Sequence, residues 1–278
     1  MRTVLRAASA AVAAVVWSLV WSQASLAAPT QCQPQALRDL ERLAPQGHAV
    51  YDAISDKRHF LRFLTCDDVV LGLSTAVHES VHLLTSEKDA YPLVDGSTAQ
   101  RPSESLRFFA PRKIAGRFNA GDMYVRTYLK PGEASSSTDF RFLLDELNAY
   151  SHDVATSTKL TSLIRPEHGQ VGHRDGLAAL MTFVMSYTDM ARQSVPATWA
   201  NLQRPEVRQT VVTLWNQAEA ALAVACTIPA FGQDDRRSLA FLSDPENGAG
   251  LTELLGRTPA RNCLESVNTA ESGARLTR

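Results

Sequence analysis

Apolar residues recur at helical spacing along most of the chain. In residues 35–43, leucines stand three positions apart and predict a short amphipathic helix. Pro45 and Gly47 interrupt this pattern, which resumes over residues 48–64 as a second predicted helix. This part of the chain is therefore predicted to be helical.

The next predicted helix, residues 67–86, is apolar on almost every side. Asp67 and Asp68 can cap its N-terminus, because a short carboxylate side chain accepts hydrogen bonds from free backbone N–H groups. Apolar side chains then occupy most of the helix surface: Val69, Val70, Leu71, Leu73, Ala76, Val77, Val81, Leu83 and Leu84. A helix of this kind is buried in a protein core.

Residues 90–133 lack a helical period and are rich in proline and glycine. Residues 123–129 alternate enough to predict a β-strand, which could pair with residues 113–118 across a turn at 119–122. We therefore expect a small β-hairpin with long loops. It could form one side of a substrate cleft, or it could be a purely structural insert.

Helical patterns dominate the rest of the chain. A strong helix is predicted to begin after a cap at Ser137 or Thr138 and to continue to about residue 163. Residues 167–176 are predicted to form a loop, and helices are expected over 177–190 and 205–226. The sequence thus predicts a mainly α fold, of the α+β type, with one domain over residues 28–278.

Composition and charge describe an ordinary globular protein. The chain has 278 residues and a formal net charge of −1, without a long basic run, so it gives no reason to expect a nucleic-acid partner. Residues 1–27 resemble a signal peptide, with a positive start, an apolar run and small residues at Ser25 and Ala27. We expect an exported protein, periplasmic or secreted, without membrane association after cleavage. A retained membrane anchor is the alternative.

Four cysteines follow the predicted signal peptide: Cys32, Cys66, Cys226 and Cys263. An even number in an exported chain suggests two disulfides. Four cysteines permit three pairings, and proximity in sequence favours Cys32–Cys66 and Cys226–Cys263. The alternative is a set of isolated buried thiols.

The candidate chemistry lies in the buried helix, at residues 78–82. His78 and His82 are four positions apart, so on a helix their imidazoles share a face and can bind one metal ion. Glu79 is placed to meet a water molecule on that ion. Ser74 and Thr75 stand one turn earlier and are small enough to leave room beside the metal.

A third protein ligand is needed for a catalytic zinc site. The positions after His82 that could supply a third histidine are Thr85 and Lys88, so a compact three-histidine site is excluded. Asp145 and Glu146, on the later helix, are the candidates. Glu146 lies on the apolar stripe, where an unpaired carboxylate is costly, whereas Asp145 is expected on a more polar face. We therefore prefer Glu146.

Together, residues 78–82 and the segment 146–150 resemble the gluzincins, which are zinc metallopeptidases with two histidines from one helix and a glutamate from a later one. The resemblance implies a zincin-like helical domain with the hairpin as an insert between the two ligand helices. It also implies one Zn²⁺ held by His78, His82 and Glu146. Glu79 would then be the general base in the hydrolysis of peptide bonds.

Further residues could complete such a site. Tyr124, Tyr128, His168 and His173 are candidates for stabilising an oxyanion, and Asp153 is a candidate partner for a metal-binding histidine. The expected partner is a peptide or protein substrate, and no oligomeric state is indicated. Two alternatives use the same residues: a zinc-stabilised binding or assembly protein without activity, and a zinc hydrolase that does not act on peptides.

Overall fold

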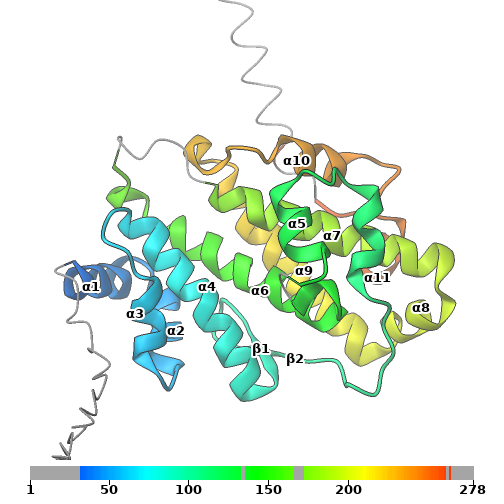
Figure 1. Cartoon of the computed structure of the whole chain (residues 1–278), viewed down its shortest axis with the longest axis horizontal. Coiled ribbons are helices and arrows are strands. Elements are labelled where there is room, and N and C mark those ends of the chain that lie inside the picture. The colour runs from blue at the N-terminus through cyan, green and yellow to red at the C-terminus, as the bar shows by residue number, and fades with distance from the viewer. Residues whose placement is uncertain (1–31, 133–134, 166–171, 261–262, 264–278) are drawn as a thin grey trace, which may run out of the picture.

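The computed structural model describes residues 32–132, 135–165, 172–260 and 263, and these residues are mainly helical (Figure 1). The N-terminal helices are α1 (Gln33–Leu43), α2 (Pro45–Ala53), α3 (Lys57–Phe63) and α4 (Val69–Lys88), followed by the strands β1 (Ala90–Pro92) and β2 (Thr98–Gln100). Next come the 3₁₀-helix η1 (Pro111–Arg117), α5 (Met123–Leu129), the 3₁₀-helix η2 (Ser135–Ser137), α6 (Phe140–Ser157) and the 3₁₀-helix η3 (Thr161–Leu163). The last elements are α7 (His173–Ser194), α8 (Pro196–Leu202), α9 (Pro205–Ala225), the 3₁₀-helix η5 (Pro229–Phe231), α10 (Arg236–Ser243) and α11 (Ala249–Leu255). None of the described helices is long and apolar enough to cross a membrane.

Two hydrophobic clusters meet where α4 packs against α6. One cluster is built from α1 to α4 and includes Ala149 and Leu160. The larger cluster is built from the strands and from α5 to α11, and it contains the apolar face of α6. Figure 1 shows α6 running through the middle of the molecule beside α4, with α7 and α9 on its other side. The polar residues between these two helices therefore lie at the boundary of the two clusters.

The sequence of α4 explains its buried position. Asp68 caps the helix by accepting a hydrogen bond from the Leu71 amide, as predicted, and Asp89 ends it in a left-handed conformation with φ of 47°. Gly72 lets α4 approach the preceding segment closely, because a Cβ atom there would lie 2.6 Å from the Thr65 backbone nitrogen. The predicted burial is confirmed, since Leu73, Ala76 and other apolar side chains on several sides are fully buried.

The predicted hairpin is wrong in its position. Residues 123–129 form α5, and residues 113–118 belong mostly to η1, whereas the two-stranded antiparallel sheet pairs β1 with β2. The physical reason is the Asp122 side chain, which accepts hydrogen bonds from the Tyr124 and Val125 amides and so starts a helix. The coarser prediction of a small two-stranded insert between α4 and α6 is confirmed.

Several helix boundaries also differ from the predictions. Residues 48–64, predicted as one helix, contain the end of α2, a break and α3. Helix α6 begins after Asp139, whose side chain accepts a hydrogen bond from the Arg141 amide, and it ends at Ser157 rather than near residue 163. Helix α7 begins at His173, so part of the predicted loop at 167–176 is helical. The predicted signal peptide lies outside the described residues.

Both predicted disulfides are confirmed. Cys32–Cys66 joins the start of α1 to the segment before α4, with a Cα–Cα distance of 5.7 Å, and Cys226–Cys263 joins the end of α9 to the C-terminal segment, at 5.3 Å. Two disulfides are consistent with an extracellular protein.

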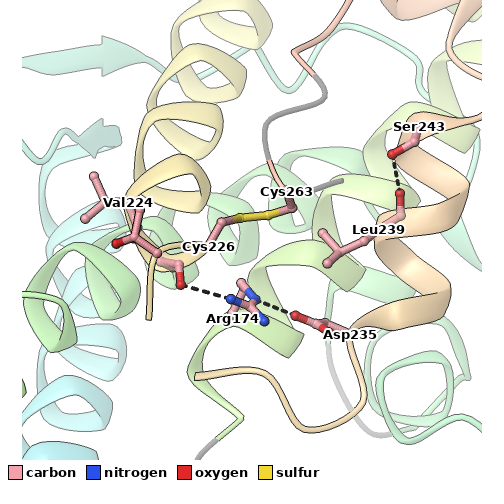
Figure 2. The surroundings of a disulfide bond; sticks show 9 residues. Arg174, Val224, Cys226, Asp235, Leu239, Ser243 and Cys263 are labelled. Carbon is pink, nitrogen blue, oxygen red and sulfur yellow. Dashed lines mark hydrogen bonds and ion pairs between the residues drawn. A yellow bond between two sulfur atoms is a disulfide. The ribbon is translucent and has the colours of Figure 1, made fainter. Parts of the chain in front are cut away.

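The second disulfide lies beside a group of contacts that hold the start of α7. Figure 2 shows Arg174 between the end of α9 and the segment before α10. Its guanidinium donates a 2.9 Å hydrogen bond to the Ala225 carbonyl and forms an ion pair with Asp235. The adjacent Asp175 accepts hydrogen bonds from the Gln233 and Asp234 amides. These contacts place residues 233–235 next to α7.

Candidate metal centre and adjoining cleft

His78, His82 and Glu146 form a compact group between α4 and α6. The two Nε2 atoms of the histidines are 3.2 Å apart, and the Glu146 Oε2 atom lies 3.6 Å from His78 Nε2 and 3.4 Å from His82 Nε2. The described residues contain this single group of three histidine, cysteine or acidic side chains with metal-binding geometry. The structure thus brings together the three residues predicted as metal ligands.

The spacing of these three atoms fits one metal ion. Ligand atoms about 2.0–2.1 Å from a tetrahedral zinc are about 3.3–3.4 Å from one another, close to the three distances here. Glu146 Oε2 is buried and makes no hydrogen bond of normal geometry. Burial raises the pKa of Glu146, but the two imidazoles outweigh this effect and lower it to about 2. The carboxylate is therefore ionised and directed at the point that a metal would occupy.

Asp145 orients one of the two histidines. Its Oδ2 atom lies 2.7 Å from His82 Nδ1, and the side chain is 7% exposed. A proton on Nδ1 that is donated to Asp145 leaves the Nε2 lone pair directed at His78 and Glu146. Asp145 is thus buried and is a partner of a candidate metal ligand.

Glu79 lies on the adjoining side of α4 and is half-buried. Its backbone carbonyl accepts a 3.2 Å hydrogen bond from His59 Nε2, which holds α3 against this turn of α4. Burial raises the pKa of Tyr128, and the charges of Glu146 and Glu79 raise it further. Both carboxylates are therefore close enough to Tyr128 to act on its ionisation.

A cluster of three tyrosines reaches the histidines through Tyr150. The Tyr150 ring meets the His78 ring edge-on, with centroids 4.6 Å apart, and its hydroxyl lies 2.8 Å from the Tyr128 hydroxyl. The Tyr124 ring is nearly parallel to the Tyr128 ring, with centroids 6.4 Å apart. Gly176 makes room for Tyr150, because a Cβ atom at position 176 would lie 2.0 Å from the Tyr150 ring. The contact with α7 therefore fixes the ring that packs against His78.

His173 is placed by two other polar residues. Its Nδ1 atom lies 3.1 Å from Asp153 Oδ1 and 3.3 Å from Ser74 Oγ, while the Ser74 hydroxyl donates to the Leu71 carbonyl. Both neighbours of Nδ1 are then acceptors, so the proton of the neutral ring lies on Nδ1 and Nε2 is an acceptor. This Nε2 atom is buried and has no hydrogen-bond partner within the described part of the chain.

A cleft of about 540 Å³ adjoins the candidate metal centre. Tyr150 connects the two, since it packs against His78 and also lines the cleft. Thr75, one helical turn before Glu79, lines the cleft as well. Thr75, one of the two small residues expected to leave room beside the metal, thus borders a cavity that extends to α5 and to the start of α7.

No protein-family model, curated protein or solved structure matches this chain. Its function must therefore be inferred from the residues of the site.

The other predicted site residues have definite positions. Tyr124 and His173 line the cleft, Tyr128 lies behind Tyr150, and His168 is outside the described residues. Asp153 is hydrogen-bonded to His173 rather than to a candidate metal ligand.

Sequence reasoning missed two contributions to the site. Asp145 is adjacent to Glu146 in sequence. Its role as a partner of His82 could have been found by asking whether both acidic residues can reach the two histidines. The role of Gly176 had no sequence signal, because it depends on how α7 crosses α6.

Proposed function

We propose that this protein is an exported zinc-dependent peptidase in which His78, His82 and Glu146 bind the metal and Glu79 is the general base. One observation carries the proposal: two imidazole nitrogens and a carboxylate oxygen lie 3.2–3.6 Å apart, next to a glutamate and an open cleft. Two imidazoles and one carboxylate are a ligand set typical of catalytic zinc.

The number of ligands favours catalysis over a purely structural role. Structural zinc sites have four protein ligands, whereas catalytic sites have three and leave one position for water or substrate. The described residues offer three candidate ligands here. The half-buried Glu79 supports the same interpretation, because a structural site has no need for a base beside the metal.

When bound, zinc would polarise the scissile carbonyl and lower the pKa of a water molecule at the site. Glu79 would take a proton from the attacking water and transfer it to the leaving amine. Asp145 would keep His82 in the tautomer that presents Nε2. A hydroxyl of the Tyr128–Tyr150 pair would donate a hydrogen bond to the developing oxyanion, since a phenol is protonated at neutral pH and Tyr150 packs against His78. His173 is less suited to that role, since its Nε2 atom is an acceptor in the neutral ring.

The decisive experiment combines metal analysis with peptide cleavage. Purified wild-type protein should contain about one zinc per chain, and Glu79→Gln should keep the metal while losing about 10²–10⁴-fold in kcat. Glu87→Gln is the matched control, because Glu87 is an exposed residue on the same helix and should not affect turnover. Absence of bound metal, or equal activity of Glu79→Gln and wild type, would contradict the proposal.

Export is supported by the two disulfides and by the signal-like N-terminus. The mature chain should begin near residue 28. Intact-mass analysis of the protein recovered from its native compartment tests this, and retention of residues 1–27 would refute it.

A further inference from the structure

The cleft beside the candidate metal centre is lined by carboxylates from five separate parts of the chain. Asp68 and Asp122 come from the caps of α4 and α5, Asp153 and Asp175 from α6 and α7, and Asp234 from the segment before α10. None of the described residues that line the cleft is lysine or arginine. The whole chain is nearly neutral, with 28 basic and 29 acidic residues, so the cleft concentrates negative charge.

A second observation indicates what the cleft would bind. His173 lines it, is 3% exposed, and has an Nε2 atom without a hydrogen-bond partner in the described structure. Because Asp153 and Ser74 both accept at Nδ1, the Nε2 atom of the neutral ring offers a lone pair. A ligand that supplies hydrogen-bond donors and positive charge would complement both this nitrogen and the carboxylates.

The other surfaces of the cleft suit an extended chain with a long side chain. Tyr124 and Tyr150 contribute aromatic rings, which attract cations. Leu71 and Met123, which are 42% and 58% exposed, also line the cleft and offer apolar surface to the aliphatic part of a lysine or arginine.

We propose that this cleft binds the positively charged group of a peptide substrate, a protonated amine or guanidinium, within about two residues of the scissile bond. The distance follows from α4: Thr75 in the cleft is one turn, about 5.4 Å, from Glu79. One residue of an extended peptide spans about 3.3–3.6 Å, so adjacent positions reach the cleft. The inference rests on the proposed peptidase function, and it adds the class of substrate.

The test uses internally quenched peptides with Lys, Arg, norleucine or Glu at each position around the scissile bond. Wild-type protein should cleave the Lys or Arg peptides at least about ten-fold faster, in kcat/KM, than the norleucine peptides, and the ratio should fall with added salt. Peptides with free and acetylated N-termini distinguish the two sources of charge. If the preference survives acetylation, the bound charge belongs to the side chain. If acetylation removes the preference, the bound charge belongs to the terminal amine.

The variant Asp122→Asn/Asp234→Asn removes two charges while keeping the helix cap, because Asn caps as well as Asp. The ratio of Lys to norleucine cleavage should fall about three- to ten-fold in this variant. Asp56→Asn is the matched control, since Asp56 caps α3 and does not line the cleft. A norleucine preference, or an unchanged ratio in the double variant, would overturn the inference while leaving the peptidase proposal intact.

A peptide-binding measurement distinguishes the peptidase proposal from the proposal that the cleft binds a positively charged group. Glu79→Gln should bind a fluorescent Lys peptide about ten-fold more tightly than its norleucine counterpart in an anisotropy titration. If wild-type protein binds in this way and cleaves nothing, the peptidase proposal fails and the cleft assignment stands. If neither peptide binds preferentially, the cleft assignment fails.

Discussion

Removal of the Asp145 charge should weaken metal binding without disturbing the fold. In Asp145→Asn the side chain keeps its size, so its oxygen can still accept from His82 Nδ1. The substitution therefore removes the charge that favours this contact, while the packing between α4 and α6 remains. Asp145→Ala removes both the charge and the hydrogen bond.

The magnitude follows from the contact itself. A 2.7 Å hydrogen bond to a buried carboxylate is charge-assisted, and bonds of that kind contribute about 1.5–3 kcal/mol. Such a loss corresponds to a decrease of about 10–100-fold in zinc affinity, which agrees with the usual effect of removing the partner of a metal-binding histidine. Asp145→Asn should lie near the lower end of this range, and Asp145→Ala near the upper end.

The assay is a competition titration of zinc against a chromophoric chelator at neutral pH. Asp153→Asn is the control, because Asp153 is also a buried carboxylate of α6 but is hydrogen-bonded to His173. It should bind zinc within about two-fold of wild type. If Asp145→Asn retains full affinity while Asp153→Asn loses it, the orienting role assigned to Asp145 is refuted.

Three other predictions concern stability. Gly176→Ala should destabilise the fold by about 1–3 kcal/mol and weaken zinc binding, since the added methyl group must displace the Tyr150 ring; thermal unfolding and the zinc titration measure both effects. Burial lowers the pKa of His152 to about 4, so the unfolded state binds more protons than the folded state between that pH and about 6.5. The free energy of unfolding of the metal-free protein should therefore fall by about 2 kcal/mol between pH 6.5 and 4.5, as measured by urea titration. In His152→Gln this fall should be smaller. Replacing the Cys32–Cys66 disulfide by two serines should lower the free energy of unfolding by about 4 kcal/mol, because the bond closes a long loop; a change below about 1 kcal/mol would contradict this.

The long helices could be predicted from the sequence because their apolar patterns are long enough to define a period. Helix α4, with apolar residues on every side and an Asp68 cap, illustrates this. The seven residues of α5 are too few to do so, since Tyr124 and Tyr128 fit a helical period while the same segment also fits an alternating one. The side chain of Asp122 decides between the two, through hydrogen bonds that pattern alone does not reveal.

The metal ligands could be predicted because they depend on spacing within two helices. The role of Asp145 could not, since its contact with His82 depends on how α6 packs against α4. In the structure α6 packs against α4, α7 and α9, so adjacent positions such as Asp145 and Glu146 are both covered. The acidic cleft could not be predicted from the sequence for another reason. Its carboxylates come from five positions spread over residues 68–234, and only the packing of the helices brings them together.

The candidate metal centre lies between the two hydrophobic clusters, and this position suggests why the contact between α4 and α6 is polar. An apolar contact between α4 and α6 would stabilise the fold more simply, because buried charges are costly unless they are paired or bound to a metal. His78, His82, Asp145 and Glu146 occupy that position instead, and each contacts another member of the group. A zinc ion at 1,000 times its Kd would add about 4 kcal/mol to the folded state. Metal binding would thus both join the two clusters and hold Glu79 beside the cleft, so folding stability and activity should be lost together when the metal is removed.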